Sequence, residues 1–381
     1  MEPSPPAHRT PAVELVRSLT DEHVLRALMQ RRRLTRAELA TLIGISKPTA
    51  GESVRRLTER GLVVDTGERT PGGRGRGRVG SYYALADTGV ALAVSIAPEG
   101  IVAESVDAYG DTVARTSQDV PRPAEPAAVA AALTTVARQV GTPRLAVVSA
   151  ADPVDRATGR LVQLPDAPFL VGQLDPVDIF ASYVAGPVIV DNDVNWAARA
   201  ERSRRPGLDD FAYLYLGEGL GCAIVNDGEV KRGHSGLAGE IAHLITAGPG
   251  DHAVRLIEVF AELGLRRPES SAIDVDVLLA VATAQTREAE ITRDVVGRAI
   301  AGVVAAVVAL ADPEQIIVGG SWGPALLDSI RAAVARMPRQ APIGAAGVTA
   351  EPALAGARID ALERLRASIT SPNDRIAASV P

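Results

Sequence analysis

The sequence predicts an α/β protein in two parts: an N-terminal winged helix-turn-helix domain and a larger, two-lobed body built from a duplicated α/β fold. Three observations lead to this fold class. Residues 35–78 read as two short helices, a strand and an arginine-rich loop. Downstream, a three-stranded meander followed by alternating helices and strands begins twice, near residues 90 and 211. The chain has 381 residues, 46% of them hydrophobic, so two or three domains with sizeable cores are expected.

Local signals define the helix-turn-helix. A short amphipathic helix is expected over residues 35–44, ending at Gly44. The next helix begins after Ser46, a good N-cap, accepts Pro48 in its first turn, and runs to about Arg60. Two further helices are expected before it, over residues 11–19 and 21–31. One buried seam is predicted to hold Leu39, Leu42, Ile45, Val54 and Leu57.

The second helix of such a motif lies in the major groove of DNA, with its first turns facing the base edges. Its expected DNA-contacting residues are Ser46, Lys47, Thr49, Ala50, Ser53, Arg55 and Arg56. The glycine-rich segment 72–78 adds Arg74, Arg76 and Arg78, which suit the negative potential of a narrow minor groove. The alternative for these three arginines is a flexible, solvated linker.

The charge distribution agrees with a DNA-binding domain. Residues 31–80 contain 12 Lys and Arg against 5 Asp and Glu, a net charge of +7. The whole chain carries −6, which leaves −13 for the remainder. A basic module on an acidic body is the pattern expected of a DNA-binding head on a soluble body.

The body is expected to alternate strands and helices. Strands are predicted at residues 90–96, 101–107, 112–117, 144–149, 187–190, 211–216, 221–226, 229–231 and 316–320. Helices are predicted at residues 123–139, 196–202, 254–263, 272–282, 293–311, 324–336 and 357–369. The expected division is a head at 12–85, a smaller lobe at 86–196, a larger lobe at 197–369, and loose tails at 1–11 and 370–381.

Cysteine content and hydropathy indicate the cellular compartment in which the protein is expected. Cys222 is the single cysteine, so no intramolecular disulfide can form, and a reducing cytoplasm is expected. No signal peptide is recognised, and no apolar run is expected to approach the length that spans a bilayer.

Three segments of the body resemble the ROK family, which groups repressors, open reading frames and sugar kinases on an actin-like, two-lobed fold. They are Val190–Asn195, Leu216–Gly221 and Arg232–His243, and a later match is Asp312–Gly320. A winged helix before the body is also typical of the family's regulators. The resemblance covers about residues 12–369.

The resemblance implies a sugar site. Asn192 and Asp193 match the pair that holds sugar hydroxyls, the aspartate being the base in the kinases. Glu240, His243 and Glu258 match further sugar-contacting positions. Each has an alternative from its sequence context alone: Asp193 could cap the helix that follows it, Glu240 and His243 could make local hydrogen bonds, and Glu258 could lie on a solvated face.

Departures from the family argue against a kinase. Where the kinases carry an Asp-x-Gly-Gly-Thr phosphate loop, this chain has Ser95–Glu99, with Pro98 removing a donor and Glu99 adding negative charge. In the other lobe, the family's Gly-Thr-Gly aligns with Gly217-Glu218-Gly219, so Glu218 stands where the kinases have a threonine. We therefore expect no ATP binding, no catalytic residues and no cofactor.

The structural zinc of some relatives is also expected to be absent. The positions of the zinc-binding cysteines are Pro249, Asp251 and Leu256, and none supplies a thiolate. His243 and His252 alone do not complete a tetrahedral site.

The expected function is a DNA-binding transcriptional regulator, a repressor of carbohydrate or related metabolic genes, gated by a sugar or sugar phosphate and acting as a homodimer or homotetramer. Two alternatives stay open: a ligand-blind regulator controlled by a protein partner or by abundance, and an ATP-dependent sugar kinase with a DNA-binding head.

Overall fold

The computed structural model describes residues 11–70, 79–122, 124–164, 169 and 173–370. The expected tails, apart from Pro11 and Thr370, and the three arginines Arg74, Arg76 and Arg78 lie outside these residues. The chain divides into two compact units. Unit 1, which contains the N-terminal head, comprises residues 1–91, 105–113 and 362–381, and unit 2, which contains most of the body, comprises 92–104 and 114–361.

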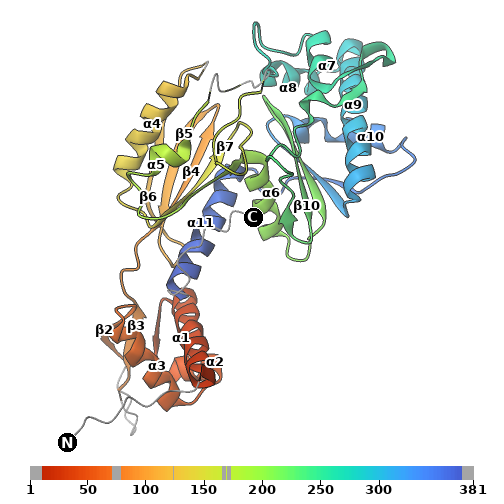
Figure 1. Ribbon diagram of the computed structural model, residues 1–381. Coiled ribbons are helices and arrows are strands. Elements are labelled where there is room, and N and C mark those ends of the chain that lie inside the picture. The colour runs from red at the N-terminus through yellow and green to blue at the C-terminus, as the bar shows by residue number, and fades with distance from the viewer. Residues whose placement is uncertain (1–10, 71–78, 123, 165–168, 170–172, 371–381) are drawn as a thin grey trace, which may run out of the picture. The chain divides into compact units, whose positions relative to one another are not determined.

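The head is a winged helix-turn-helix (Figure 1). Its elements are α1 Pro11–Arg31, β1 Arg33–Thr35, α2 Arg36–Ile43, α3 Lys47–Glu59, β2 Val63–Arg69 and β3 Ser81–Leu85. The three strands pair antiparallel in the order β1-β3-β2. Thr35 and Glu38 form a reciprocal capping box at the start of α2, and Gly44 ends that helix with φ 78°. Ser46 caps α3 as expected, accepting a hydrogen bond from the Thr49 amide.

Two sequence expectations for the head are wrong. The two helices expected over residues 11–19 and 21–31 are one helix, α1. Leu42 is 48% exposed and does not belong to the buried seam, whereas Leu39, Val54 and Leu57 are fully buried there. Ile45 is half-buried.

The body contains two five-stranded sheets with the same topology, which confirms the predicted duplication. The first sheet has the order β6-β5-β4-β7-β8 and the second β11-β10-β9-β14-β15. In each sheet, the first strand of the meander lies in the centre. The other two meander strands follow on one side of it, and two strands from later in the chain follow on the other side. The bounds in the first are β4 Ala91–Ala97, β5 Gly100–Val106, β6 Thr112–Gln118, β7 Leu145–Ala150 and β8 Val188–Asn192. Those in the second are β9 Phe211–Leu216, β10 Leu220–Asn226, β11 Glu229–Val230, β14 Gln315–Gly319 and β15 Ile343–Ala345.

Helices cover these sheets (Figure 1). The apolar faces of α4 Pro126–Gln139 and α5 Pro176–Phe180 join the core of the first sheet. The second sheet packs against α7 Leu256–Glu262, α8 Val275–Thr283, α9 Arg287–Ala311 and α10 Leu327–Val334. Helix α6 Asp193–Arg204 follows β8 directly, and α11 Pro352–Thr370 ends the described chain. A small hairpin, β12 Ile245–Ala247 with β13 Ala253–Arg255, was not expected from the sequence.

Helix α9 corrects the expectation about apolar length. Among the helices the structure describes, it is the one whose length and composition would allow it to cross a membrane, and 56% of its most apolar window is buried within the fold. Its buried side chains, including Ile300 and Val304, belong to the core cluster of the second sheet. The core helix of a soluble domain has this character as well.

Candidate ligand cavity and nucleic-acid interface

The polar cavity of the body is built around the junction of β8 and α6. Asn192 is the N-cap of α6, and its side-chain oxygen accepts a hydrogen bond of 2.9 Å from the Val194 amide. Asp193 is the first helical residue, so the alternative in which Asp193 itself caps this helix is wrong. Asn192 takes the capping role, and Asp193 lines the cavity.

Four of the five predicted ligand-binding residues line one cavity of about 90 Å³, and they are Asn192, Asp193, Glu240 and His243. Both sheets of the body contribute to its wall, since Ala151 and Asp152 follow β7 while Leu220 and Cys222 belong to β10. The mixture of carboxylates, an amide and an imidazole beside apolar side chains is suited to a polyhydroxylated ligand.

Glu258 is not among the cavity-lining residues, which corrects that prediction. Its carboxylate lies 3.0 Å from the Arg255 guanidinium and 3.7 Å from that of Arg266. These ion pairs hold the Glu258 carboxylate beside two arginines, and the proposed site does not include Glu258.

The cavity carboxyls hold their protons unusually tightly. Burial raises the pKa of Asp193 to about 7, with further contributions from the negative charges of Glu240, Asp152 and Glu99. Burial, and then the charge of Asp152, raises the pKa of Glu240 to about 7. Near neutral pH these two side chains therefore change between hydrogen-bond acceptors and donors.

Asp152 is a cavity residue that sequence reasoning did not assign. It is 2% exposed, it lines the cavity, and its backbone carbonyl accepts a hydrogen bond of 3.3 Å from the Asn192 amide nitrogen. Its proximity to Asp193 and Glu240 becomes evident only when the two halves of the body are folded.

Asp191, which precedes the cavity residues Asn192 and Asp193, is held by two further side chains. The buried Asp191 carboxylate lies 2.7 Å from the Arg232 guanidinium and accepts a hydrogen bond of 2.9 Å from the Asn195 side chain. These contacts link the end of β8 to the loop that leads to Glu240, and no local sequence signal indicates them.

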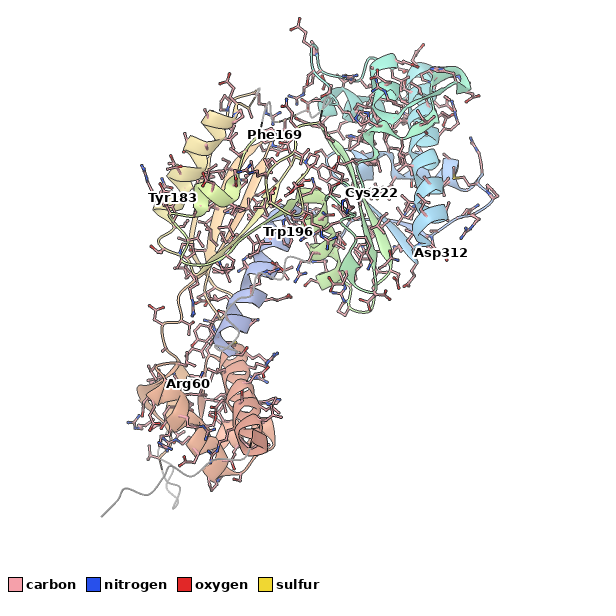
Figure 2. The ribbon with its side chains drawn as sticks, viewed as in Figure 1. Arg60, Phe169, Tyr183, Trp196, Cys222 and Asp312 are labelled. Carbon is pink, nitrogen blue, oxygen red and sulfur yellow. The ribbon has the colours of Figure 1, made fainter. Side chains whose placement is uncertain are left out.

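Gly239 fixes the backbone next to Glu240. Its φ of 96° lies in the left-handed region, and a Cβ there would stand 1.7 Å from the Cys222 carbonyl oxygen. The Cys222 amide donates a hydrogen bond of 2.9 Å to the Gly239 carbonyl, so this loop packs directly on β10. Cys222 is labelled in Figure 2. Only glycine allows that approach. Cys222 itself is buried, and burial raises the pKa of its thiol to about 12.

Glu218 lies on the cavity wall and is held by two arginines. Arg122 and Arg267 each donate a hydrogen bond of 2.8 Å to its Oε1 atom. Arg122 also donates a hydrogen bond of 2.9 Å to the Pro98 carbonyl, in the segment aligned with the family's phosphate loop. The Glu218 side chain is 15% exposed. We call Glu218, Arg122 and Arg267 the Glu218 clamp.

The segment that aligns with the family's zinc loop is organised by hydrogen bonds. His252 contacts the Pro249 carbonyl at 2.6 Å and Glu262 at 3.1 Å, and these two partners raise its pKa, Glu262 more strongly. Asp251 lies 3.5 Å from the Arg298 guanidinium. Among the described residues, no group of three or more His, Cys, Asp or Glu is arranged to hold a metal ion.

The exposed face of α3 differs from the predicted one. Lys47, Thr49 and Arg55 are exposed, as is Ser46 at the helix start. Ala50 and Ser53 are completely buried, which corrects the prediction that they contact DNA. Arg56 is half-buried, and its guanidinium lies 2.6 Å from Asp21 of α1.

The buried polar network explains this correction. Ser53 donates a hydrogen bond to Asp21, and Arg56 and Arg60 surround the same carboxylate at 2.6 and 3.9 Å. Arg60 is labelled in Figure 2. Ser53 and Arg56 thereby join α3 to α1, and Ser53 is completely buried. The helical face that remains exposed includes Glu52 and Glu59, which were not assigned to the interface from the sequence.

Comparison with known proteins agrees with this architecture. The ROK family model matches residues 93–357, and a winged helix-turn-helix DNA-binding model matches residues 17–64. The bifunctional enzyme NanE/NanK of Brucella melitensis is 32% identical over 158 residues, covering 40% of this chain and 30% of that enzyme. A glucokinase of Streptomyces coelicolor is 30% identical over 161 residues, covering 41% of this chain. This chain therefore spans half or less of the length of these two enzymes.

Solved structures show the same fold. A ROK family transcriptional regulator, described as a homologue of the E. coli MLC protein, aligns with a TM-score of 0.62 at 19% identity, over 94% of this chain and 99% of that one. The ROK family glucokinase of Streptomyces griseus, solved with glucose and AMPPNP, aligns with a TM-score of 0.55 at 22% identity, over 72% of this chain and 100% of that one. The family match spans well over half of the sequence, and the chain belongs to the ROK family, with an N-terminal winged helix-turn-helix DNA-binding domain.

Proposed function

We propose that this protein is a DNA-binding transcriptional regulator, a repressor of carbohydrate or related metabolic genes. The observation that carries the proposal is the combination of a helix-turn-helix head, with α3 exposed at its N-terminal turns, and a ROK body. A sugar kinase has no evident use for such a head. The absence of disulfide chemistry and the DNA partner favour action in the cytoplasm.

The proposed effector is a sugar or sugar phosphate bound in the cavity lined by Asn192, Asp193, Glu240 and His243. Ionised Asp193 and Glu240 would accept hydrogen bonds from sugar hydroxyls, and Asn192 can both donate and accept. The cavity's apolar walls, such as Leu220 and Ile257, suit the carbon face of a sugar ring.

The proposed mechanism is a shift between two states of an oligomer. A homodimer or homotetramer would present two heads to half-sites about one helical turn apart. The effector would act through different affinities for the DNA-bound and free states, which is the thermodynamic requirement for ligand control.

We expect no kinase activity, and the Glu218 clamp supports that expectation. The Glu218 carboxylate occupies the two guanidinium groups that could otherwise bind a phosphate. Glu99 adds a further negative charge to the cavity wall, which opposes the approach of a triphosphate. The kinase alternative keeps support from the similarity to glucokinases, and measurable ATP turnover on a panel of hexoses would establish it. The ligand-blind alternative predicts that no sugar changes the melting temperature of the protein.

The decisive experiment is fluorescence anisotropy on labelled DNA from upstream of the protein's own gene, at fixed salt, titrated with sugars and sugar phosphates. Release of DNA by one compound would support a ligand-gated repressor. The Asp193→Ala variant should bind the same DNA and no longer respond to that compound. Tight DNA binding that no compound alters would favour the ligand-blind alternative, and no DNA binding at all would overturn the proposal.

A further inference from the structure

The most outward-facing residues of α3 include acidic side chains, which contacts with DNA phosphates do not explain. At about 100° per residue, the buried residues Ala50, Ser53, Val54 and Leu57 lie between about 240° and 340° around the helix, counted from Lys47. On the same count, the centre of the opposite face is occupied by Arg55 at about 80°, Pro48 at about 100°, Glu59 at about 120° and Glu52 at about 140°. Two of these four residues are acidic.

These charged residues form one exposed chain of ion pairs. Arg55 lies 2.9 Å from Glu52 and 2.5 Å from Glu59, and the side chains of Arg55, Glu52 and Glu59 are 55%, 60% and 59% exposed. Both Arg55 contacts with Glu52 use its Oε2 atom, at 2.9 Å from Nη2 and 3.3 Å from Nε. The Oε1 atom of Glu52 takes no part in these two contacts and remains an available acceptor.

The one other basic residue of α3, Arg56, lies 2.6 Å from the buried carboxylate of Asp21. Arg60, which directly follows the helix, lies 3.9 Å from the same carboxylate. The exposed face therefore combines Lys47 and Arg55 with Glu52 and Glu59, a balance of charge that provides little attraction to phosphates. A face of this kind is poorly suited to sequence-independent binding, and its polar groups are better suited to base edges.

Base edges in the major groove match both members of the first pair. Cytosine presents its N4 amino group as a donor, which a glutamate accepts, and guanine presents N7 and O6, which an arginine contacts with two hydrogen bonds. We propose that Glu52 and Arg55 determine operator specificity by reading cytosine and guanine, respectively, in one or two neighbouring C·G base pairs of the half-site. This inference rests on the proposed DNA-binding function and gives its base preference.

The position of Glu52 favours this role over Glu59. Glu52 is the sixth residue of α3, within the first two turns, where the recognition helix of a helix-turn-helix meets the bases. Glu59 is the last residue of α3, three helical turns and more from Lys47 by count. Because both carboxylates contact Arg55, Glu59 provides a matched control for any effect that comes only from changing the ion pairs of Arg55.

The experiment is selection of binding sites from a randomised duplex DNA pool by the full-length protein, compared with the Glu52→Gln, Arg55→Lys and Glu59→Gln variants. Affinity for a fixed duplex without the selected site is measured in parallel. Wild type should enrich one or two C·G pairs at fixed positions. Glu52→Gln should lower discrimination for cytosine by roughly tenfold or more, the range expected for a specific base contact. It should also bind the unselected duplex severalfold more tightly at low salt, because a like charge near phosphates has been removed.

Each remaining outcome has a defined meaning. Arg55→Lys should weaken discrimination for guanine, because an ammonium group can reach guanine but lacks the planar pair of donors of a guanidinium. Glu59→Gln should select the wild-type sequence. If Glu52→Gln selects the wild-type sequence, or if Glu59→Gln erases the preference equally, Glu52 is only an ion-pair partner and the inference is overturned. If wild type binds no duplex in the pool, the proposed DNA-binding function fails as well. Thermal unfolding of each variant separates loss of specificity from loss of fold.

Discussion

Ser53 donates a hydrogen bond of 2.5 Å to Asp21 inside the head, and both side chains are buried. The bond connects the middle of α3 to the middle of α1, and Arg56 binds the same carboxylate. A polar position on the recognition helix therefore stabilises the domain that presents the helix, and it does so without facing DNA.

Replacing Asp21 with alanine should destabilise the head by roughly 2–4 kcal/mol, because Ser53 and Arg56 would lose their buried partner. Asp21→Asn should cost less, since an amide oxygen can still accept the Ser53 hydrogen bond. The measurement is urea denaturation followed by circular dichroism. Glu22→Ala, which removes a partly exposed pair with Arg26, is the control and should cost less than about 0.5 kcal/mol. Equal effects of the Asp21 and Glu22 changes would contradict this account.

Replacing Glu218 with glutamine should destabilise the body by roughly 1–3 kcal/mol, because Arg122 and Arg267 would face each other without their shared carboxylate. The variant should also gain thermal stability from added inorganic phosphate, which can take the vacated position between the two guanidinium groups. Thermal unfolding with and without phosphate measures both effects. Glu290→Gln, at an exposed pair with Arg287, serves as the control. A phosphate response equal to that of wild type would show that the carboxylate does not occupy an anion site.

The stability of the body should depend on Asp193 and Glu240 between about pH 4 and 7. The pKa of each is raised to about 7 in the folded chain, so these carboxyls favour folding fully below about pH 4 and lose that contribution as pH rises through 7. Asp193→Asn, which cannot ionise, should therefore be more stable than wild type at pH 8 by roughly 1–3 kcal/mol and nearly equal to it at pH 4. Denaturant titrations at the two pH values test this. Asp276→Asn, at an exposed helix position, should show no such difference.

Gly239→Ala should destabilise the body by more than about 2 kcal/mol, because a side chain adds left-handed strain and collides with the Cys222 carbonyl. Gly264→Ala is the matched control: Gly264 also has a positive φ of 66° but has no atom within 4 Å of the added Cβ, so only about 1 kcal/mol is expected. Thermal unfolding of the two variants separates collision from backbone strain. Equal losses would mean that the Gly239 loop can move away from β10.

Removal of metal ions should leave the fold unchanged. Hydrogen bonds and ion pairs of His252 and Asp251 organise the segment that aligns with the zinc loop of relatives. We expect that a chelator does not lower the melting temperature and that metal analysis of the purified protein finds no stoichiometric zinc. A chelator-induced decrease that added zinc reverses would contradict this expectation.

Sequence reasoning predicted the head well where local chemistry decides the structure. The helix end at Gly44 and the Ser46 cap both lie within four residues of the groups they bond. It failed at Thr20 and Asp21, which resemble the start of a helix. Thr20 bonds back to the Val16 carbonyl at 2.8 Å within α1, and Asp21 serves α3. At this position the tertiary contacts of Asp21 outweigh the local sequence signal for a helix start.

The same distinction applies to the body. The duplicated meander, with its short strands and turn residues, could be predicted from alternation and glycine positions, and both sheets confirm it. The cavity was predicted through family resemblance at Asn192, Asp193, Glu240 and His243. Asp152 and the Arg122 contact to Glu218 could not be predicted, because they depend on residues at least 40 positions apart. Glu258 was assigned to the cavity by alignment alone, and its neighbouring arginines hold it elsewhere.

In the Glu218 clamp, the Glu218 carboxylate competes with free anions for binding to Arg122 and Arg267. Glu218 is tethered to its two arginines by the fold, so its carboxylate is present beside them at an effective concentration on the order of millimolar or above. A free anion, whether the phosphate of an effector or of a nucleotide, must exceed that local concentration or bring additional contacts of its own. The two arginines therefore bind the abundant phosphate compounds of a cell only weakly. A ligand that displaces Glu218 must gain the necessary binding free energy from contacts with the rest of the cavity.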